Sequence, residues 1–369
     1  MYKYKHFIQE NIAPVGATSI GMYDSKGKRV GGMSLGRLKP PTENKLYSCC
    51  VISDPHIPRE TASTDFQRAL TFAENNCAFT CVCGDLTVNG TDSELDQYKS
   101  IVNGYAKTKP VYAVGGNHDS IPADMTFNRL TTYTGKPMYY SLGMGADGNC
   151  VDSDVNKTPK VYGNSVKDVF IMLSHYGKYE GDYIGWLPAK FVSVEEIQWL
   201  YETLEANRDK RCFVFNHVYP YQDGVGDAGR FYGGKNWDTE DKSIGQAFIN
   251  LLKHYKNTIL FHGHSHLRLH LQEIDDKANY SSRAGYRSVH IPSLSIPRDR
   301  VNGSTEYVFA ESEGYVVDVY ENYIILNGRD FIDNDADGHL LPIATYKIDT
   351  TLQTIEPNTF VDNTGTITV

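Results

Sequence analysis

Short apolar runs and helix-spaced apolar residues alternate along much of the chain. Continuous apolar runs of a few residues predict buried strands. These runs lie at residues 46–52, 77–83, 111–114, 169–173, 212–215 and 259–261. Apolar residues three and four positions apart predict amphipathic helices. Such sets fall between the runs, at residues 66–73, 95–102, 197–204 and 244–255. The alternation predicts an α/β fold, with a central sheet layered with helices.

Beyond residue 266 the apolar residues recur at every second position, which is typical of half-buried strands. The runs 315–320 and 323–326 predict a β-hairpin. A second hairpin is expected around a turn at residues 24–27, and one more strand near residues 345–348. The chain is therefore divided into an N-terminal β accessory segment (1–45), a main domain (46–331) and a C-terminal β accessory tail (332–369), packed as one large unit.

Two motifs match known binding loops in sequence, but the residues that follow them do not fit the structures of such loops. Residues 120–168 are expected to be rich in loops, and within them Gly143–Gly148 matches the dinucleotide pattern GxGxxG. Because Asn149 and the polar residues after it do not predict a helix, we interpret the match as chance. The stretch Asp333–Gly338 resembles the start of a calcium loop, but Ala344 stands where such a loop has Glu. A solvated turn is the better interpretation.

Composition narrows the possible partners. The 369 residues carry a net charge of −9, which argues against a general nucleic-acid binder, because binding along phosphate backbones needs a basic surface. A phosphorylated substrate remains compatible with this charge if the site brings its own metal cations. We therefore expect a small phosphorylated substrate, and neither nucleic acid nor membrane, as the partner.

Cysteine usage and the N-terminal residues suggest a compartment. The seven cysteines are an odd number, and Cys81 and Cys83 lack a second close pair, so neither a disulfide framework nor a zinc knuckle is expected. Buried thiols in a reducing compartment fit better. The first residues hold no apolar stretch typical of a signal sequence, and no window approaches a membrane span. We expect a cytoplasmic protein, although a chain trimmed of an export signal would look the same.

Five of the predicted strands end in residues that can bind metals. A single histidine after a strand is most often an ordinary loop residue, and Gly116–Asp119 alone could be a polar turn. Five such endings point to one site, because the carboxyl ends of neighbouring strands in one open α/β sheet converge on one crevice. Carboxylates, imidazoles and an amide oxygen together suit Mn, Fe, Zn or Co. The residues are Asp54, His56, Asp85, Asn117, His118, His217, His264 and His266.

The order of these motifs resembles the calcineurin-like metallophosphoesterase family over residues 46–270. The pattern D-x-H, G-D, G-N-H-D, H and G-H-x-H is present here in that order. It stands as Asp54–His56, Gly84–Asp85, Gly116–Asp119, His217 and Gly263–His266. Each fragment is weak alone, whereas the joint order is specific. The resemblance implies a fold of central β-sheets layered with helices and two metal ions at the carboxyl ends of the strands.

The resemblance also implies a role for each residue. Asp54, His56 and His266 would hold the first metal ion, and Asn117, His217 and His264 the second. Asp85 would bridge the two ions, and a hydroxide between them would attack phosphorus. His118 and Asp119 are the expected catalytic residues. His118 would contact the phosphate or protonate the leaving oxygen, and Asp119 would support its loop rather than bind a metal.

One departure from the family pattern argues against a protein phosphatase. The Ser/Thr phosphatase branch carries GDxxDRG, but Val88 and Asn89 replace its second Asp and its Arg. Val88 therefore removes the carboxylate that would orient His118. Four other histidines (His175, His262, His270 and His290) are expected to be structural, although His262 could reach the edge of the site.

The activity that we expect is metal-dependent hydrolysis of a phosphomonoester or phosphodiester, with a small organic phosphate or a nucleotide as substrate. The alternatives are a nuclease and a catalytically silent scaffold that binds a protein partner. Specificity is expected in the loops at residues 120–168, 177–192 and 220–243.

Overall fold

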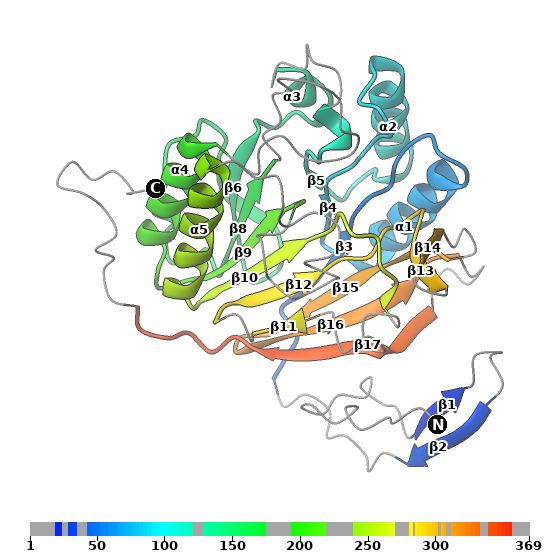
Figure 1. Ribbon diagram of the computed structural model, residues 1–369. Coiled ribbons are helices and arrows are strands. Elements are labelled where there is room, and N and C mark those ends of the chain that lie inside the picture. Colours follow the sequence, from blue (N-terminus) through cyan, green and yellow to red (C-terminus); the bar gives the residue numbers. More distant parts are fainter. Residues whose placement is uncertain are drawn as a thin grey trace.

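The main body of the protein has four layers, in the order helix, sheet, sheet, helix (Figure 1). The computed structural model describes residues 19–23, 29–34, 43–120, 128–174, 193–218, 239–269, 280–282, 285–301, 304–307, 311–332 and 339–355. The prediction of an α/β fold layered with helices is confirmed. The expectation of one open sheet is wrong, because the predicted strands divide between two sheets that pack face to face.

The first of these sheets has six strands in the order β17-β16-β15-β3-β4-β5. Its parallel half is β3 (Tyr47–Ile52), β4 (Phe79–Cys83) and β5 (Val111–Val114). Its antiparallel half is β15 (Glu313–Val319), β16 (Tyr323–Asp330) and β17 (His339–Asp349). The predicted hairpin of β15 and β16 is confirmed, and the predicted C-terminal strand is longer than expected and forms the edge of this sheet.

The second sheet has seven strands in the order β11-β12-β10-β9-β8-β6-β7. Four are parallel: β8 (Asp168–Leu173), β9 (Arg211–Asn216), β10 (Thr258–His262) and β12 (Arg287–His290). Three are antiparallel to their neighbours: β6 (Tyr139–Met144), β7 (Cys150–Asp154) and β11 (Tyr280–Ser281). Small separate sheets are formed by β1 (Ser19–Tyr23) with β2 (Arg29–Ser34), and by β13 (Arg298–Val301) with β14 (Ser304–Tyr307).

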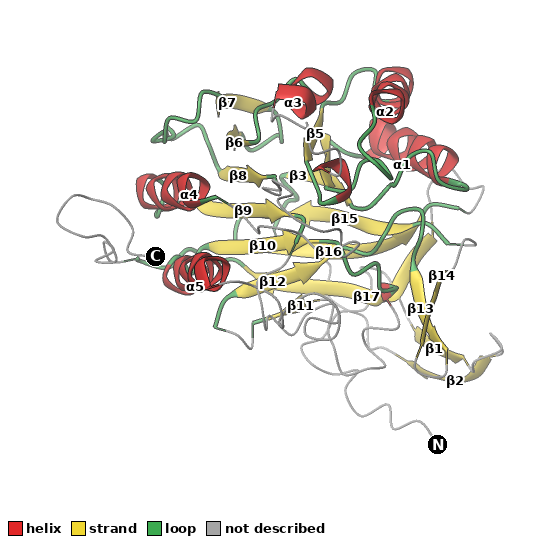
Figure 2. Ribbon diagram, turned by 45° about the horizontal axis from the view of Figure 1, so that its top comes forward, coloured by secondary structure: helices red, strands yellow, loops and turns green. Residues whose placement is uncertain are grey.

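Helices cover the outer face of each sheet (Figure 2). The six-stranded sheet is covered by α1 (Ala62–Asn76) and α2 (Asp92–Tyr105), and the seven-stranded sheet by α4 (Val194–Ala206) and α5 (Thr239–His254). Two short helices complete the fold: α3 (Asn128–Thr134) and the 3-10 turn η1 (His118–Ser120). A capping box begins α4, because Glu196 N–H donates to Ser193 Oγ and Ser193 N–H donates to Glu196 Oε2.

Aromatic side chains fill the space between the two sheets. Phe79 of the six-stranded sheet contacts Phe170 of the seven-stranded sheet, with ring centroids 5.1 Å apart, and Phe213, Phe215 and Phe261 continue this layer. All five side chains are buried. Full burial of each contributes roughly 1.5–3 kcal/mol, so this layer is a main reason why the two sheets stay together.

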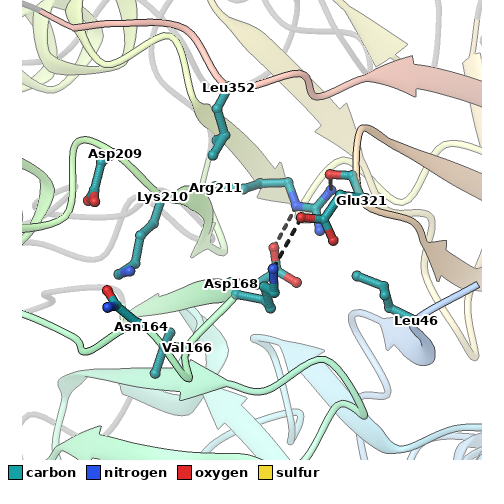
Figure 3. A pocket seen from close by; sticks show the side chains of 10 residues that line it. Leu46, Asn164, Val166, Asp168, Asp209, Lys210, Arg211, Glu321 and Leu352 are labelled. Atoms are coloured by element: carbon teal, nitrogen blue, oxygen red, sulfur yellow. Dashed lines mark hydrogen bonds and ion pairs between the residues drawn. The ribbon is translucent and has the colours of Figure 1, made fainter.

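Buried polar groups join the sheets at the amino ends of the strands (Figure 3). Arg211 Nε lies 2.6 Å from Asp168 Oδ1, and the Tyr47 hydroxyl donates to the other carboxylate oxygen of Asp168 at 2.6 Å. Arg211 Nη1 also donates to Tyr320 O at 2.8 Å. Asp168 and Arg211 also line a cavity of about 190 Å³. Because Tyr47 and Tyr320 belong to one sheet and Asp168 and Arg211 to the other, the cluster ties the sheets together.

Some details differ from the sequence predictions, and others agree with them. Residues 120–168 are not simply loops, since they include α3, β6 and β7. Ser141 and Gly143 interrupt the apolar pattern of β6, yet Ser141 Oγ is buried 2.8 Å from the Tyr162 hydroxyl. The GxGxxG match lies in the hairpin of β6 and β7, so no helix follows it, as expected. Six of the seven cysteines are buried free thiols, whereas Cys150 is exposed.

Some predictions fall outside the described residues or remain untested. His175, His270, Asp333–Gly338 and much of the expected specificity loops lie outside the described residues. The N-terminal hairpin is confirmed by the pairing of β1 with β2, whereas the division into three segments stays a prediction. Within the described chain, no helix is both long and apolar enough to span a lipid bilayer.

Candidate metal centre

The ligand-bearing loops extend the parallel pairing of the strands that precede them. After β3 and β4 end, Asp54 N–H donates to Gly84 O at 3.0 Å and His56 N–H donates to Asp85 O at 3.0 Å. The two loops therefore leave the sheet side by side. In the second sheet, Gly263 N–H donates to His217 O at 3.0 Å in the same way. This is why residues from distant parts of the sequence meet at one end of the fold.

The structure brings six of the predicted ligands into two overlapping clusters. Within each cluster, one possible ligand atom from every residue lies within 4.8 Å of the others. One cluster is Asp54, His56, Asp85 and His266, and the other is Asp85, His217 and His264. All six residues are buried. Asp85 belongs to both clusters, which is the arrangement needed for a carboxylate that bridges two ions.

The closest contacts in these clusters join imidazoles to carboxylates. His266 Nε2 lies 2.8 Å from Asp54 Oδ1, and His217 Nε2 lies 3.0 Å from Asp85 Oδ2. His56 Nε2 lies 3.7 Å from an oxygen of each carboxylate and 3.1 Å from His266 Nε2. His217 Nε2 lies 3.7 Å from Asp54 Oδ1 as well, so three imidazole nitrogens converge on this one carboxylate oxygen.

Glycines allow this close approach. A Cβ added to Gly84, whose φ is +84°, would lie 2.4 Å from the Cγ atom of His217. A Cβ on Gly263 would lie 2.0 Å from Ser53 Oγ and 2.5 Å from Asp54 Oδ2. All three distances are far below van der Waals contact, so these two motif positions have no space for a side chain.

The ligand backbone is held in an unfavourable conformation. Among the described non-glycine residues, seven have a positive φ, and five of these are predicted metal ligands: Asp54, His56, Asp85, His264 and His266. This conformation costs an L-residue roughly 1–2 kcal/mol. Concentration of such residues at one site is typical of functional sites, where the surrounding structure over-determines the geometry.

Backbone groups orient the side chains of the second cluster. His217 Nδ1 lies 2.6 Å from Cys83 O. Because a carbonyl can only accept, the proton is on Nδ1 and the lone pair of neutral His217 is on Nε2, which faces Asp85. A metal-binding histidine commonly donates its other N–H to a backbone carbonyl in this way. His264 N–H also donates to Asp54 Oδ2 at 3.1 Å, which links the two clusters.

Burial keeps three of the imidazoles in the neutral form that binds metals. It lowers the pKa of His56, lowers that of His264 well below its usual value, and lowers that of His266 to about 3. A metal ion competes with a proton for the imidazole nitrogen, so a low pKa favours the metal-binding form at neutral pH.

His217 behaves differently because two carboxylates face it. Burial alone would lower the pKa of His217, but Asp85 and Asp54 raise it to about 10. Burial would raise the pKa of Asp54, yet the nearby imidazoles, His266 first, hold it well below its usual range. The two buried carboxylates are therefore ionised and pair with protonated His217, whose Nε2 proton a metal ion would displace on binding. This donor set fits borderline divalent or trivalent metal ions.

His118 has an orienting partner that the sequence did not reveal. His118 Nδ1 lies 2.6 Å from the backbone oxygen of Val88, so Nδ1 donates and Nε2 is the nitrogen that can exchange a proton with a substrate. The ring lies edge-on to His56, with centroids 4.6 Å apart. His118 N–H also donates to Asp85 Oδ1 at 2.8 Å, and half-buried Asn117 precedes it in the same loop. The carbonyl of Val88 thus takes the orienting position of the missing carboxylate.

Asp119 holds loops together rather than facing the clusters. Its Oδ2 accepts from Gly116 N–H at 2.8 Å and Leu86 N–H at 3.0 Å. Its Oδ1 accepts from the N–H and the hydroxyl of Thr87, both at 2.9 Å. Burial and the charge of Asp85 raise the pKa of Asp119 to about 6. Asp119 therefore ties the loop after β5 to the loop after β4, whereas its role in catalysis stays a prediction.

Two further buried histidines form a separate pair. His262 and His290 are register partners on β10 and β12, and their rings lie 5.5 Å apart in an edge-on arrangement. His290 Nε2 lies 2.7 Å from Ser265 Oγ. Both rings are buried, and neither belongs to the two ligand clusters.

Comparison with known proteins identifies the family. A profile of the calcineurin-like phosphoesterases matches residues 48–268, which is more than half of the chain. The chain therefore belongs to the calcineurin-like phosphoesterase family, and its clusters of Asp and His could hold the metal ions that this family binds. No curated protein matches the chain significantly.

Solved structures share the fold at low sequence identity. GAP50, described as the anchor in the inner membrane complex of Plasmodium, has a TM-score of 0.50 and 11% identity, over 84% of this chain and 90% of its own. Zinc-bound Vps29 from Entamoeba histolytica has a TM-score of 0.32 and 11% identity, over 82% and 99%. The NAD nucleotidase of Haemophilus influenzae has a TM-score of 0.34 and 11% identity, over 83% and 50%.

Proposed function

We propose that the protein hydrolyses a phosphomonoester or phosphodiester of a small organic molecule or nucleotide, with two metal ions. The observation that carries this proposal is the pair of overlapping ligand clusters that share Asp85. Asp54, His56 and His266 would complete the first metal position. Asn117, His217 and His264 would complete the second. When bound, two such ions supply an activated water and positive charge for the phosphoryl oxygens.

The chain's own groups supply orientation and proton transfer. His118, with its Nδ1 proton directed to Val88 O, would exchange a proton with the leaving oxygen through Nε2. Asp119 keeps that loop in place through Gly116 and Thr87. The carboxylates and imidazoles are buried, and in such a low-dielectric site their interaction with charge in the transition state is stronger than in water.

A small substrate is favoured over a long nucleic acid. The net charge of −9 repels a polyanion at long range, whereas a single phosphate can be bound by the metal ions themselves. This consideration makes a nuclease the weaker enzymatic alternative.

A catalytically silent scaffold is the second candidate, and the fold likeness to the anchor protein GAP50 favours it. The two clusters argue for the enzyme instead, because binding a partner protein does not need six buried residues that could hold metal ions, grouped in two sets that share Asp85.

The experiment that tests the proposal is a hydrolysis panel. Aryl monoester, aryl diester, nucleotide and cyclic nucleotide are each offered with Mn, Fe, Zn or Co, and Asp85→Asn serves as the control that removes the bridging charge. We expect metal-dependent turnover of at least one substrate by the wild type and none by Asp85→Asn. A wild type that binds two ions and hydrolyses none of these esters would favour the scaffold.

A further inference from the structure

A segment beyond the matched family region packs directly against one set of ligand loops. Residues 291–298 follow β12, and Ser293 forms a parallel β-bridge with Ser53, immediately before Asp54. Leu294 N–H donates to Ser53 O at 2.8 Å. The segment therefore adds a strand-like neighbour to the loop that leaves β3.

Two buried serine hydroxyls hold the backbone of that loop. Ser293 Oγ donates to Asp54 O at 2.9 Å, and Ser295 Oγ donates to Pro55 O at 2.6 Å. Ser293 Oγ also accepts from Ile296 N–H at 3.1 Å. Both serines have no exposed surface. These bonds fix the backbone oxygens of Asp54 and Pro55. Asp54 and His56, the ligands on either side of Pro55, both have a positive φ.

The end of the same segment holds the other loop of the first metal position. Arg298 N–H donates to His266 O at 2.7 Å, and Arg298 forms a parallel β-bridge with Leu267. His266 is the third of the ligands with a positive φ in this position. One segment therefore contacts the backbone of Asp54 and His266 directly, and the backbone of Pro55 immediately before His56.

The second metal position is held by other groups. His217 is oriented by Cys83 O, and the loop of Asn117 is tied through His118 N–H to Asp85 and through Asp119 to Thr87. None of these bonds involves residues 291–298. The side chains of Ser293 and Ser295 therefore support the first metal position alone. The two positions share Asp85 and are linked by the bond from His264 N–H to Asp54 Oδ2. On the second side, the segment contributes the backbone bond from Ile291 N–H to His262 O.

We infer that Ser293 and Ser295 are positioning residues that set the affinity of the first metal position and leave the second unaffected. This inference rests on the metal assignment of the proposed function. Removal of a group that positions a ligand typically lowers metal affinity by about 10–100-fold. Ser293→Ala should have the larger effect, because it removes the acceptor of Ile296 N–H and leaves Asp54 O only the longer bond from Ser295 Oγ at 3.4 Å. Ser295→Ala removes that longer bond and the bond to Pro55 O, and Asp54 O keeps the bond from Ser293.

The test is isothermal titration calorimetry, in which the metal-free full chain is titrated with Mn²⁺. Ser141→Ala is the matched control, because Ser141 is equally buried and loses one hydroxyl contact, with Tyr162, remote from the ligand loops. We expect two ions per wild-type chain. In Ser293→Ala, one affinity should fall by about 10–100-fold and the other should change less than twofold. Ser141→Ala should match the wild type.

A double-mutant comparison assigns the affected position. In a His266→Ala background, where the first position has lost a ligand, Ser293→Ala should cause no further loss of Mn²⁺ affinity. In an Asn117→Ala background, where the second position has lost a ligand, Ser293→Ala should lower the Mn²⁺ affinity of the first position. Equal loss of both affinities, no loss of either, or an effect in the His266→Ala background would overturn the inference.

Folding and function are separated by the same samples. Melting of the metal-free variants reports whether they fold. If Ser293→Ala and Ser295→Ala both fail to fold while Ser141→Ala folds, the hydroxyls maintain the fold rather than one metal position, and the inference is wrong. A wild type that binds two ions but hydrolyses no ester contradicts the proposed function alone. A wild type that binds no Mn²⁺ contradicts both.

Discussion

Gly263→Ala tests the close packing of the metal centre with a single methyl group. The added Cβ would lie 2.0 Å from Ser53 Oγ and 2.5 Å from Asp54 Oδ2. The φ of Gly263 is outside the left-handed region, so alanine can adopt this backbone conformation and the cost is steric. Relief of the overlap requires movement of the Asp54 carboxylate, which is a predicted metal ligand.

The expected loss of stability follows from the close packing around Gly263. Overpacking of a close-packed interior costs typically about 1–3 kcal/mol, so Gly263→Ala should lower the stability of the metal-free protein by that amount. Gly104→Ala is the matched control, because it lies in α2 and a Cβ there meets nothing within 4 Å. Alanine in a helix is more stable than glycine by roughly 0.5–1 kcal/mol, so the control should raise stability.

Thermal melting and metal analysis check this pair of substitutions. Gly263→Ala should melt below the wild type and bind one ion fewer per chain after Mn²⁺ reconstitution, whereas Gly104→Ala should melt above it and keep its metal. A Gly263→Ala protein with wild-type melting and metal content would show that the loops yield easily, and the reasoning from close approach would be refuted.

Three further predictions concern other parts of the structure. His118→Ala should lower turnover by about 10²–10⁴-fold, and elemental analysis should find its metal content unchanged; loss of metal would mean that His118 is a ligand. Arg211→Met leaves the buried carboxylate of Asp168 without its ion-pair partner and should lower the free energy of unfolding by about 3–5 kcal/mol. Denaturant titration measures this loss, and an unchanged unfolding transition would show that the ion pair does not tie the two sheets together. Burial raises the pKa of Glu196 from 4.5 to about 8, so between these values the folded state keeps a proton that the unfolded state releases. The stability that Glu196 contributes is therefore complete below pH 4.5 and is lost as the pH rises to 8. Glu196→Gln should flatten the fall in melting temperature between pH 5 and 8, and an unaltered pH profile would contradict the assignment.

The candidate site was largely predictable because its residues follow strands. Asp54, Asp85 and His217 come directly after apolar runs, and apolar runs mark strands without knowledge of the fold. The carboxyl ends of parallel strands then converge, whichever sheet each strand joins. The division into two sheets was not predictable, since pairing between distant strands depends on tertiary packing that local periodicity does not encode.

Backbone partners explain what the sequence could not reveal at the site. Val88 predicts the absence of a carboxylate beside His118, but its carbonyl is present whatever the side chain, and only the fold brings the two together. The positive φ of His56 and His266 is likewise invisible to residue preferences, because it is imposed by neighbouring loops. Ser293 lies outside the recognisable motifs, so only its hydrogen bond to Asp54 O reveals its position.

The number of metal ions per chain tests the central claim most directly. The protein is purified without chelator, reconstituted with Mn²⁺, freed of excess metal and analysed for metal and protein content, with aryl phosphate ester hydrolysis measured on the same sample. The overlapping clusters around Asp85 predict two ions per chain and metal-dependent turnover. Fewer than one ion per chain, with no turnover, would contradict the account.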